Sequence, residues 1–98
     1  DVSKFVYLLS KHIFFVASYY LYIEKKLYLN SRRSLEENWS QNYSEMIPLV
    51  ALKIANGKLK SSEKYILPFM TYIENTVEET RKILEKRYGK KKVYVDPF

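Results

Sequence analysis

Cysteine is absent from this sequence of 98 residues, while glycine, proline and histidine occur only two, three and one times. Without cysteine the chain cannot form disulfides, thiolate zinc sites or cysteine-ligated iron–sulfur clusters, and the cellular compartment stays undecided. So few glycines and prolines leave little material for the turns of β-hairpins. We therefore expect a mostly helical chain.

Apolar and aromatic residues are plentiful, at 47% and 16% of the sequence. This content is ample for a packed globule and argues against disorder. We predict a single compact all-α domain of about five helices, spanning residues 1–98 and near the lower size limit for a self-sufficient core. Because the chain does not begin with Met, we expect it to be trimmed from a longer protein. Many Lys, Glu, Ile and Tyr residues with a single Gln suit a thermophile.

The charge balance points to an acidic partner. Seventeen lysines and arginines against eleven acids give a formal net charge of +6 and a pI near 9.4. This balance favours nucleic acid, a nucleotide or an anionic surface, and a basic domain without an acidic partner is the alternative. The basic residues gather at Arg32-Arg33, at Lys58, Lys60 and Lys64, and between Arg81 and Lys92.

The first segment predicts one long helix from Val2 to Leu29. An apolar stripe recurs at steps of three or four residues, and a second ridge has a spacing of seven. The stripe consists of Val2, Phe5, Val6, Leu9, Ile13, Val16, Tyr20, Ile23 and Leu27, and the ridge consists of Tyr7, Phe14, Leu21 and Tyr28. A helix that is apolar on two sides must be covered on two sides, either within this domain or by another subunit.

The same segment is the one membrane candidate. Lys11 and His12 interrupt it and leave Ile13–Ile23 as its apolar run, which is shorter than the roughly 20 residues that a spanning helix needs. We therefore expect no membrane span and a cytoplasmic location.

A capping signal predicts a short second helix. Ser34 and Glu37 form a Ser-x-x-Glu capping box that would start a helix running through Trp39. Arg32-Arg33 would then lie in the turn before it.

Proline and glycine indicate helix starts and ends in the middle of the chain. Pro48 suits the first turn of a helix, and Gly57 is a typical C-terminal stop. Ser61 or Ser62 would cap the next helix, and Pro68 inside that helix should kink it.

This kinked helix is expected to end near Glu74. Thr76 and Glu79 form a second capping box, which would open a last helix ended by Gly89. Val93–Val95 could then add a short C-terminal β segment.

Catalytic machinery is nearly absent from the sequence. His12 is the only histidine and lies in an apolar helix, which favours a packed or partly exposed residue over a catalytic base. The paired acids at 36–37 and 78–79 are adjacent and fit capping positions, without the spacing of a metal site. Nucleotidyl transfer needs carboxylates to hold divalent metals, and the only aspartates are Asp1 and Asp96. We expect a non-enzymatic protein with no metal and no cofactor.

The loop before the predicted kinked helix is the candidate phosphate-binding site. Lys58 and Lys60 directly precede a helix start at Ser61, and Lys64 and Tyr65 follow in its first turn. A helix N-terminus has unpaired N–H groups and a partial positive charge, so nearby cations make an anion site. An ordinary solvated lysine face is the alternative.

Four further residues are candidates for contacts with nucleic acid. Arg32 and Arg33 could reach a phosphate backbone, although such a pair is usually just a charged turn. Trp39 and Tyr72 could stack a base, and the alternative for both is a role in the hydrophobic core.

The order of elements over Ile47–Leu84 resembles the C-terminal domain of the large subunit of archaeal and eukaryotic primases. In that family a helix opening with Pro-Pro-Cys leads through a basic loop into a helix with further basic residues. Here Leu49 follows Pro48 in place of the family's first cluster cysteine, so the resemblance is to a cluster-free version of the domain. Tyr94–Phe98 is similar to the family's Tyr-x-Pro-Phe-like stretch.

The resemblance implies a non-catalytic primase subunit that acts in primer synthesis during archaeal DNA replication. By residue order, Lys60, Ser61 and Lys64 match the family's contacts with the 5′-triphosphate and template, with Tyr65 beside them and Ser61 in place of a histidine. The implied partners are the small catalytic and the large primase subunits, together with a ribonucleotide triphosphate and a single-stranded DNA template.

Two other classes of protein stay open. One is a generic basic helical module that binds DNA or RNA without nucleotide specificity. The other is a helical assembly protein whose tyrosine-rich first helix forms an oligomer, with the basic charge incidental.

Overall fold

The computed structural model describes residues 1–28, 31–42 and 46–89. These ranges contain four α-helices and one short 3₁₀ helix, and no strand occurs in them. The helices are α1 (Val2–Lys25), α2 (Arg32–Asn42), α3 (Ile47–Ala55), η1 (Glu63–Tyr65) and α4 (Ile66–Tyr88). The predicted all-α domain is confirmed, and the predicted β segment at Val93–Val95 lies outside the described residues.

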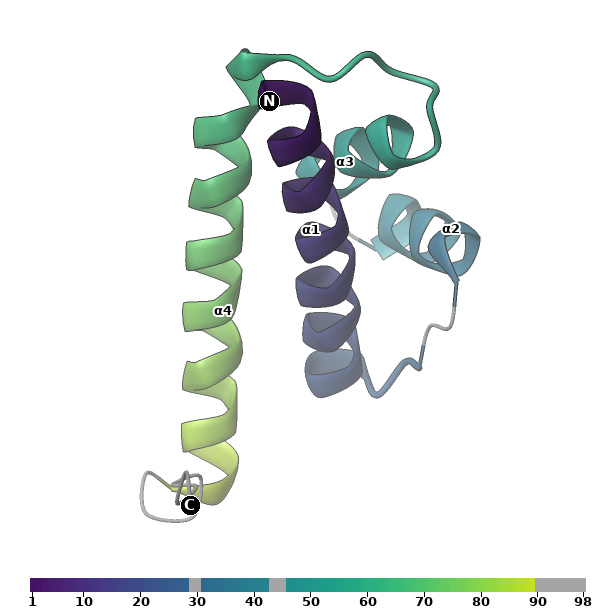
Figure 1. Cartoon of the computed structure of the whole chain (residues 1–98). Helices are drawn as coiled ribbons and strands as arrows, with labels where there is room; N and C mark the ends of the chain where they lie inside the picture. Colours follow the sequence, from purple (N-terminus) through teal and green to yellow (C-terminus); the bar gives the residue numbers. More distant parts are fainter. Residues whose placement is uncertain (29–30, 43–45, 90–98) are drawn as a thin grey trace, which may run out of the picture.

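α1 lies at the centre of the domain and contacts every other helix. Figure 1 shows α4 running parallel to α1 along one side, whereas α2 and α3 pack against the other side. The long loop after α3 crosses the end of the molecule at which α1 begins, and it leads through η1 into α4. Parallel neighbours require this long return connection.

The core-facing side of α1 repeats every three or four residues. Val6, Ile13, Ala17 and Leu21 are completely buried, and the buried Ser10 hydroxyl donates a hydrogen bond of 3.0 Å to the Val6 carbonyl oxygen. The predicted ridge is covered only in part, because Leu21 is buried while Tyr28, also on the ridge, is 80% exposed.

α1 is bounded by a cap at each end. The Asp1 carboxylate accepts a hydrogen bond of 2.9 Å from the Ser3 N–H. Lys26 adopts the left-handed conformation with φ of 57°, and its N–H is donated back to the last turn. This left-handed residue ends the helix at Lys25, four residues before the predicted end at Leu29.

The rest of the core comes from the helices on both sides of α1. Its buried members outside α1 are Leu35, Trp39, Ala51, Leu52, Ile54, Phe69 and Tyr72. The three rings of Tyr20, Trp39 and Tyr72 form a chain in which each neighbouring pair is 6.4 Å apart between centroids. α2, α1 and α4 are joined through these aromatic contacts.

α2 begins earlier than the sequence predicts. The Ser31 hydroxyl oxygen, rather than that of Ser34, accepts the capping hydrogen bond, which comes from the Ser34 N–H at 3.1 Å. Arg32 and Arg33 consequently lie in the first turn of the helix, and the helix continues past Trp39 to Asn42. Serine at either position fits the rule for N-caps, so the capping box alone did not determine the start.

α4 is one helix where the sequence predicts two. Thr76 is buried inside it, and its carbonyl oxygen accepts a hydrogen bond of 2.8 Å from the Thr80 hydroxyl, so the capping box predicted there is wrong. Pro68 is the third residue of α4. A proline in the first turn removes an N–H that has no intrahelical partner, so the predicted kink is not required.

The predictions for Pro48 and the two glycines are confirmed. Pro48 lies in the first turn of α3, and Gly57 and Gly89 both have φ of 75°. Gly57 follows the end of α3, while Gly89 caps α4 and donates its N–H to the Glu85 carbonyl oxygen at 2.7 Å. Glycine adopts this left-handed conformation without a steric cost.

Among the described helices, α1 alone is long and apolar enough to cross a membrane by length and composition. The core helix of a soluble protein and a signal sequence meet the same criterion, and α1 is buried only in part, with Phe15, Tyr19 and Tyr22 exposed.

Candidate phosphate-binding site at the basic end

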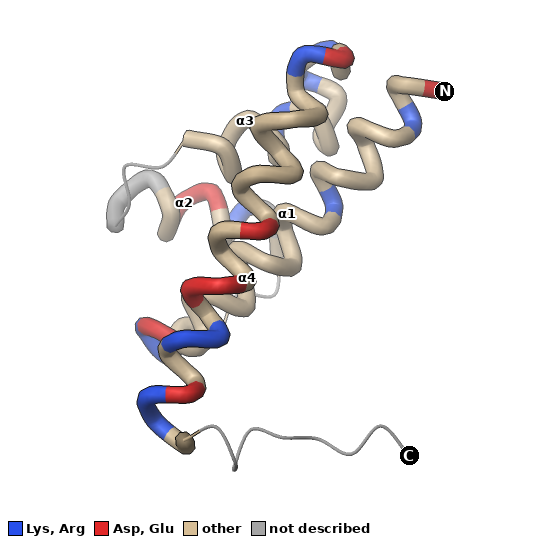
Figure 2. Tube along the Cα trace, turned by 90° about the vertical axis from the view of Figure 1, so that its left-hand side faces the viewer, with Lys and Arg blue, Asp and Glu red and all other residues tan. Residues whose placement is uncertain are grey.

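Six lysines gather at the end of the molecule where α1 begins and the α3–η1 loop crosses. They are Lys4 and Lys11 of α1, Lys53 of α3, Lys58 and Lys60 of the loop, and Lys64 of η1. Asp1 and Glu63 are the only acids in residues 1–12 and 53–65, so these two segments carry a net charge of +4. Figure 2 shows this concentration of basic residues, which we call the basic end.

The α3–η1 loop is held by its own backbone and by one apolar anchor. The N–H groups of Lys58 and Leu59 both donate to the Lys53 carbonyl oxygen, at 2.8 and 3.2 Å. The half-buried Leu59 side chain packs against the core. Anchoring at Leu59 leaves the side chains of Lys58 and Lys60, one residue to each side, exposed to solvent.

Ser62 begins the next helix. Its backbone is extended, with φ of −154° and ψ of 150°, and its hydroxyl oxygen lies 3.5 Å from the Lys64 N–H. Of the two predicted capping residues, Ser62 therefore takes the position, while Ser61 is half-buried in the loop before it. The lysines thus flank the start of a helical segment, as the sequence predicts.

Lys64 and Tyr65 lie together on η1. The Lys64 Nζ is 5.3 Å from the centroid of the Tyr65 ring, within reach of a cation–π interaction. The half-buried Tyr65 ring in turn stacks on the fully buried Phe69, with 5.5 Å between centroids and 24° between planes. The core therefore orients Tyr65, and Tyr65 provides a surface for the lysine.

Lys11 repeats this arrangement on α1. Its Nζ lies 5.0 Å from the centroid of the exposed Tyr7 ring, one turn earlier. Two lysine–tyrosine pairs therefore occur at the basic end. A tyrosine beside a cation can stack a base while the cation meets a phosphate.

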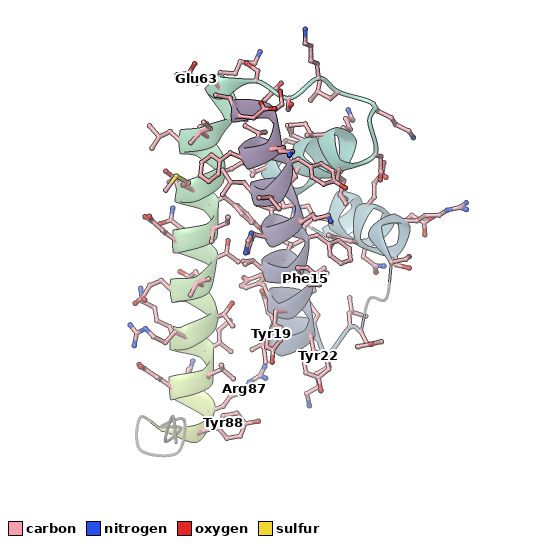
Figure 3. All side chains as sticks on the ribbon, viewed as in Figure 1. Phe15, Tyr19, Tyr22, Glu63, Arg87 and Tyr88 are labelled. Carbon is pink, nitrogen blue, oxygen red and sulfur yellow. The ribbon has the colours of Figure 1, made fainter. Side chains whose placement is uncertain are left out.

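Glu63 is the residue at this site that sequence reasoning missed. It lies between Ser62 and Lys64 in the first turn of η1, and it is exposed at the outer tip of the molecule (Figure 3). A carboxylate at a helix N-terminus stabilises the helix. The same charge repels an anion that approaches this end of the molecule.

Trp39 and Tyr72 do not lie on the surface, where a base could stack on their rings. They are 3% and 8% exposed and belong to the core. They also line a cavity of about 500 Å³ beside α4, whose lining residues include Glu79 and no lysine or arginine. This cavity lacks the cations that a phosphate requires.

Arg32 and Arg33 lie on α2, which does not contact η1. The exposed Arg33 side chain forms an ion pair of 3.3 Å with Glu37. The structure therefore does not bring these arginines together with the lysines of the basic end.

The remaining titratable candidates have structural partners. The His12 ring is exposed, with Nδ1 3.0 Å from the Leu8 carbonyl oxygen. Arg81 forms ion pairs with both Glu78 and Glu85. The hydrogen bond from Arg81 lowers the pKa of Glu78, and the same two acids raise the pKa of Arg81. No group of three metal-ligating side chains is found within residues 1–28, 31–42 and 46–89.

No protein-family model, no curated protein and no solved structure matches this chain. Any family assignment thus depends on the sequence resemblance alone.

Proposed function

We propose that the chain is a non-catalytic nucleotide-binding domain that holds the 5′-triphosphate of an initiating nucleotide at the basic end. The observation that carries this proposal is the exposure of Lys58, Lys60 and Lys64 along one anchored connection from α3 into α4. Together they offer three ammonium groups to a ligand of high negative charge.

Three kinds of group would contribute to nucleotide binding at the basic end. The lysines neutralise phosphate oxygens, and the positive end of the η1–α4 segment adds to the same potential. The tyrosines at positions 7 and 65 each lie beside a lysine and can face a base or sugar next to the phosphates. Lys4 and Lys53 extend the positive surface over which a template strand would run.

The biological setting that we propose is primer synthesis. The order of Pro48, the basic loop and the following helix supports a relative of the C-terminal domain found in the large subunit of primases, of the cluster-free kind represented by crenarchaeal PriX. In this role the domain presents the initiating nucleotide and template to a catalytic subunit that holds the metal ions. Tethering raises the effective concentration of one nucleotide beside the other, which otherwise limits a reaction between two small molecules.

The test compares two oligonucleotides that differ only at the 5′ end. One carries a triphosphate and the other a hydroxyl, and both are titrated into the protein at one ionic strength by fluorescence anisotropy. A site at a fixed point gains from several added charges at one end, so we expect the triphosphate form to bind at least several-fold tighter. A surface that tracks the backbone gains little from one end.

Equal affinities for the two oligonucleotides would instead assign the basic end to generic nucleic-acid binding. Salt dependence cannot separate the two modes, because both release condensed counterions. Absence of binding to either oligonucleotide would contradict both modes.

A further inference from the structure

The cavity beside α4 is lined by three aromatic rings and one carboxylate. Tyr20 of α1, Trp39 of α2 and Tyr72 of α4 contribute the rings. Trp39 and Tyr72 are buried, so their side chains form part of its floor. The volume of about 500 Å³ lies in the range of sites that hold small molecules. We call this hollow the aromatic cavity.

The lining of the aromatic cavity changes from apolar to polar along α4. Leu67 and Pro68 line it from the first turn of the helix, whereas Asn75 and Glu79 line it from two and three turns further on. At a rise of 1.5 Å per residue, about 16 Å of helix axis separate Pro68 from Glu79. The cavity therefore suits an elongated ligand with an apolar body and a polar group at one end.

Glu79 determines which charge that polar group can carry. It is the one charged residue among the described residues that line the cavity, and it forms no ion pair with any of the residues described. Its neighbours Glu78 and Glu85 are both paired with Arg81. A carboxylate without a basic partner attracts a cation and repels an anion. An ammonium group is also attracted to the faces of aromatic rings.

The groove on the other side of α4, between this helix and α1, lacks such a preference. The charged residues in its described lining are Arg81 and Glu85, and these two side chains pair with each other. No charge is therefore left there to distinguish a cation from an anion or a neutral molecule.

We propose that the aromatic cavity binds an elongated organic cation, with its ammonium group beside Glu79 and its apolar chain directed toward Leu67 and Pro68. The chemical class is an amine with a linear apolar body. This ligand is opposite in charge to a triphosphate, and the cavity shares no residue with the lysines of the basic end. The inference therefore does not depend on the proposed nucleotide binding.

The first experiment compares three probes that share one chain length and differ in charge. They are octylammonium, octan-1-ol and octanoate. Trp39 is the only tryptophan of the chain and lines the cavity, so its fluorescence reports binding there. We expect octylammonium to bind about threefold tighter than octan-1-ol and about tenfold tighter than octanoate, because attraction to Glu79 becomes repulsion.

A series of shorter amines tests the direction of the ligand. From butylammonium to octylammonium, each added CH₂ group should strengthen binding by about threefold to fourfold while the chain extends along the apolar end. An affinity that does not depend on chain length would overturn the proposed orientation, since the amine would then bind through its charge alone.

The variant Glu79→Gln tests the carboxylate while it keeps the shape of the side chain. In this variant octylammonium and octan-1-ol should bind with affinities within about twofold of each other, because the favoured charge has lost its partner. Glu74→Gln is the matched control, since Glu74 is exposed on the same helix and is not among the lining residues. The control should keep the preference of the parent chain, and circular dichroism checks that both variants remain helical.

Equal affinities of the parent chain for octylammonium and octan-1-ol would overturn the proposal, because the cavity would then accept any apolar ligand. A preference for the cation that persists in Glu79→Gln would also overturn it, since the ammonium group would then bind elsewhere. Failure of all three probes to bind by calorimetry would show that the cavity takes no ligand of this kind. None of these outcomes bears on the oligonucleotide test of the basic end.

Discussion

The basic end and the exposed residues of the tyrosine face (Phe15, Tyr19, Tyr22, Tyr28, Val77 and Tyr88) differ in both charge and apolar exposure. At the basic end six lysines outnumber two acids, and the ring of Tyr65 packs on the buried Phe69. At the tyrosine face the charges of α4 balance, and aromatic rings are left in water. The contrast arises because the lysines of the basic end come from α1, α3, the α3–η1 loop and η1, whereas α4 carries no lysine or arginine before Arg81 (Figure 2).

The contrast in burial gives the largest expected effect. Phe69→Ala and Phe15→Ala remove the same side chain, and each ring has an aromatic neighbour with a centroid 5.5 Å away. Phe69 is completely buried and Phe15 is 66% exposed. We expect Phe69→Ala to reduce the free energy of unfolding by about 3–5 kcal/mol, and Phe15→Ala by about 0.5 kcal/mol or less in dilute protein.

Urea denaturation followed by circular dichroism measures both changes. Similar losses for the two variants would remove the distinction between a packed end and an uncovered face.

The contrast in charge is tested with two pairs of lysines. Lys60→Ala/Lys64→Ala should weaken triphosphate binding about tenfold or more, because a charged hydrogen bond contributes roughly 1.5–3 kcal/mol. Lys82→Ala/Lys86→Ala removes the same charge from the balanced half of α4 and should change binding far less. Isothermal titration calorimetry with a nucleoside triphosphate gives both affinities, and equal losses would indicate a diffuse basic surface.

Glu63 gives a smaller effect of opposite sign. Replacing it by Gln removes the one acid of η1, so triphosphate affinity should increase by about twofold to fivefold, as expected for one charge near a helix terminus. Glu79→Gln makes the same substitution in the second half of α4, away from η1, and serves as the control. A decrease in affinity in the Glu63 variant would show that this carboxylate does not face the bound anion.

The smallest effect concerns pH at the balanced half of α4. Because the Arg81 hydrogen bond lowers the pKa of Glu78 below its ordinary value of 4.5, the ionised form is favoured in the folded state. The stabilisation is therefore present above that value and is lost as the pH falls through the lowered pKa. Glu78→Gln should be slightly less stable than the parent chain at pH 7, and the difference in melting temperature should disappear once the pH has fallen below the lowered pKa of Glu78. A difference that persists in acid would have another cause.

Residues with special backbone requirements were the most predictable from sequence. Pro48, Gly57 and Gly89 each mark a helix end for a local steric reason that no distant contact changes. The exposure of Lys58 and Lys60 was similarly predictable, because an ammonium group is rarely buried without a partner.

Capping boxes were the least reliable guide. Ser34–Glu37 and Thr76–Glu79 share the same Ser/Thr-x-x-Glu pattern, yet both sets lie inside helices. The pattern describes only side chains that can cap. Whether they do depends on tertiary packing, as when burial of Thr76 continues α4 through the predicted break.

The tyrosine face was only partly foreseen. Phe15, Tyr19 and Tyr22 follow the helical spacing of four and three residues, so the sequence contained the signal. The ridge identified from a spacing of seven instead included Leu21, which is completely buried. Periodicity shows that a helix has a second apolar side, but it does not show which neighbours cover it.

The central position of α1 also has a consequence during protein synthesis. α1 leaves the ribosome before every helix that covers it, and about fifty more residues must follow before Phe69 and Tyr72 of α4 are available. At about 5–20 residues per second, the apolar stripe of α1 remains uncovered by α4 for roughly 2 to 10 seconds. During that interval the uncovered apolar surface of α1 is exposed to aggregation, and the rate of translation sets how long this exposure lasts.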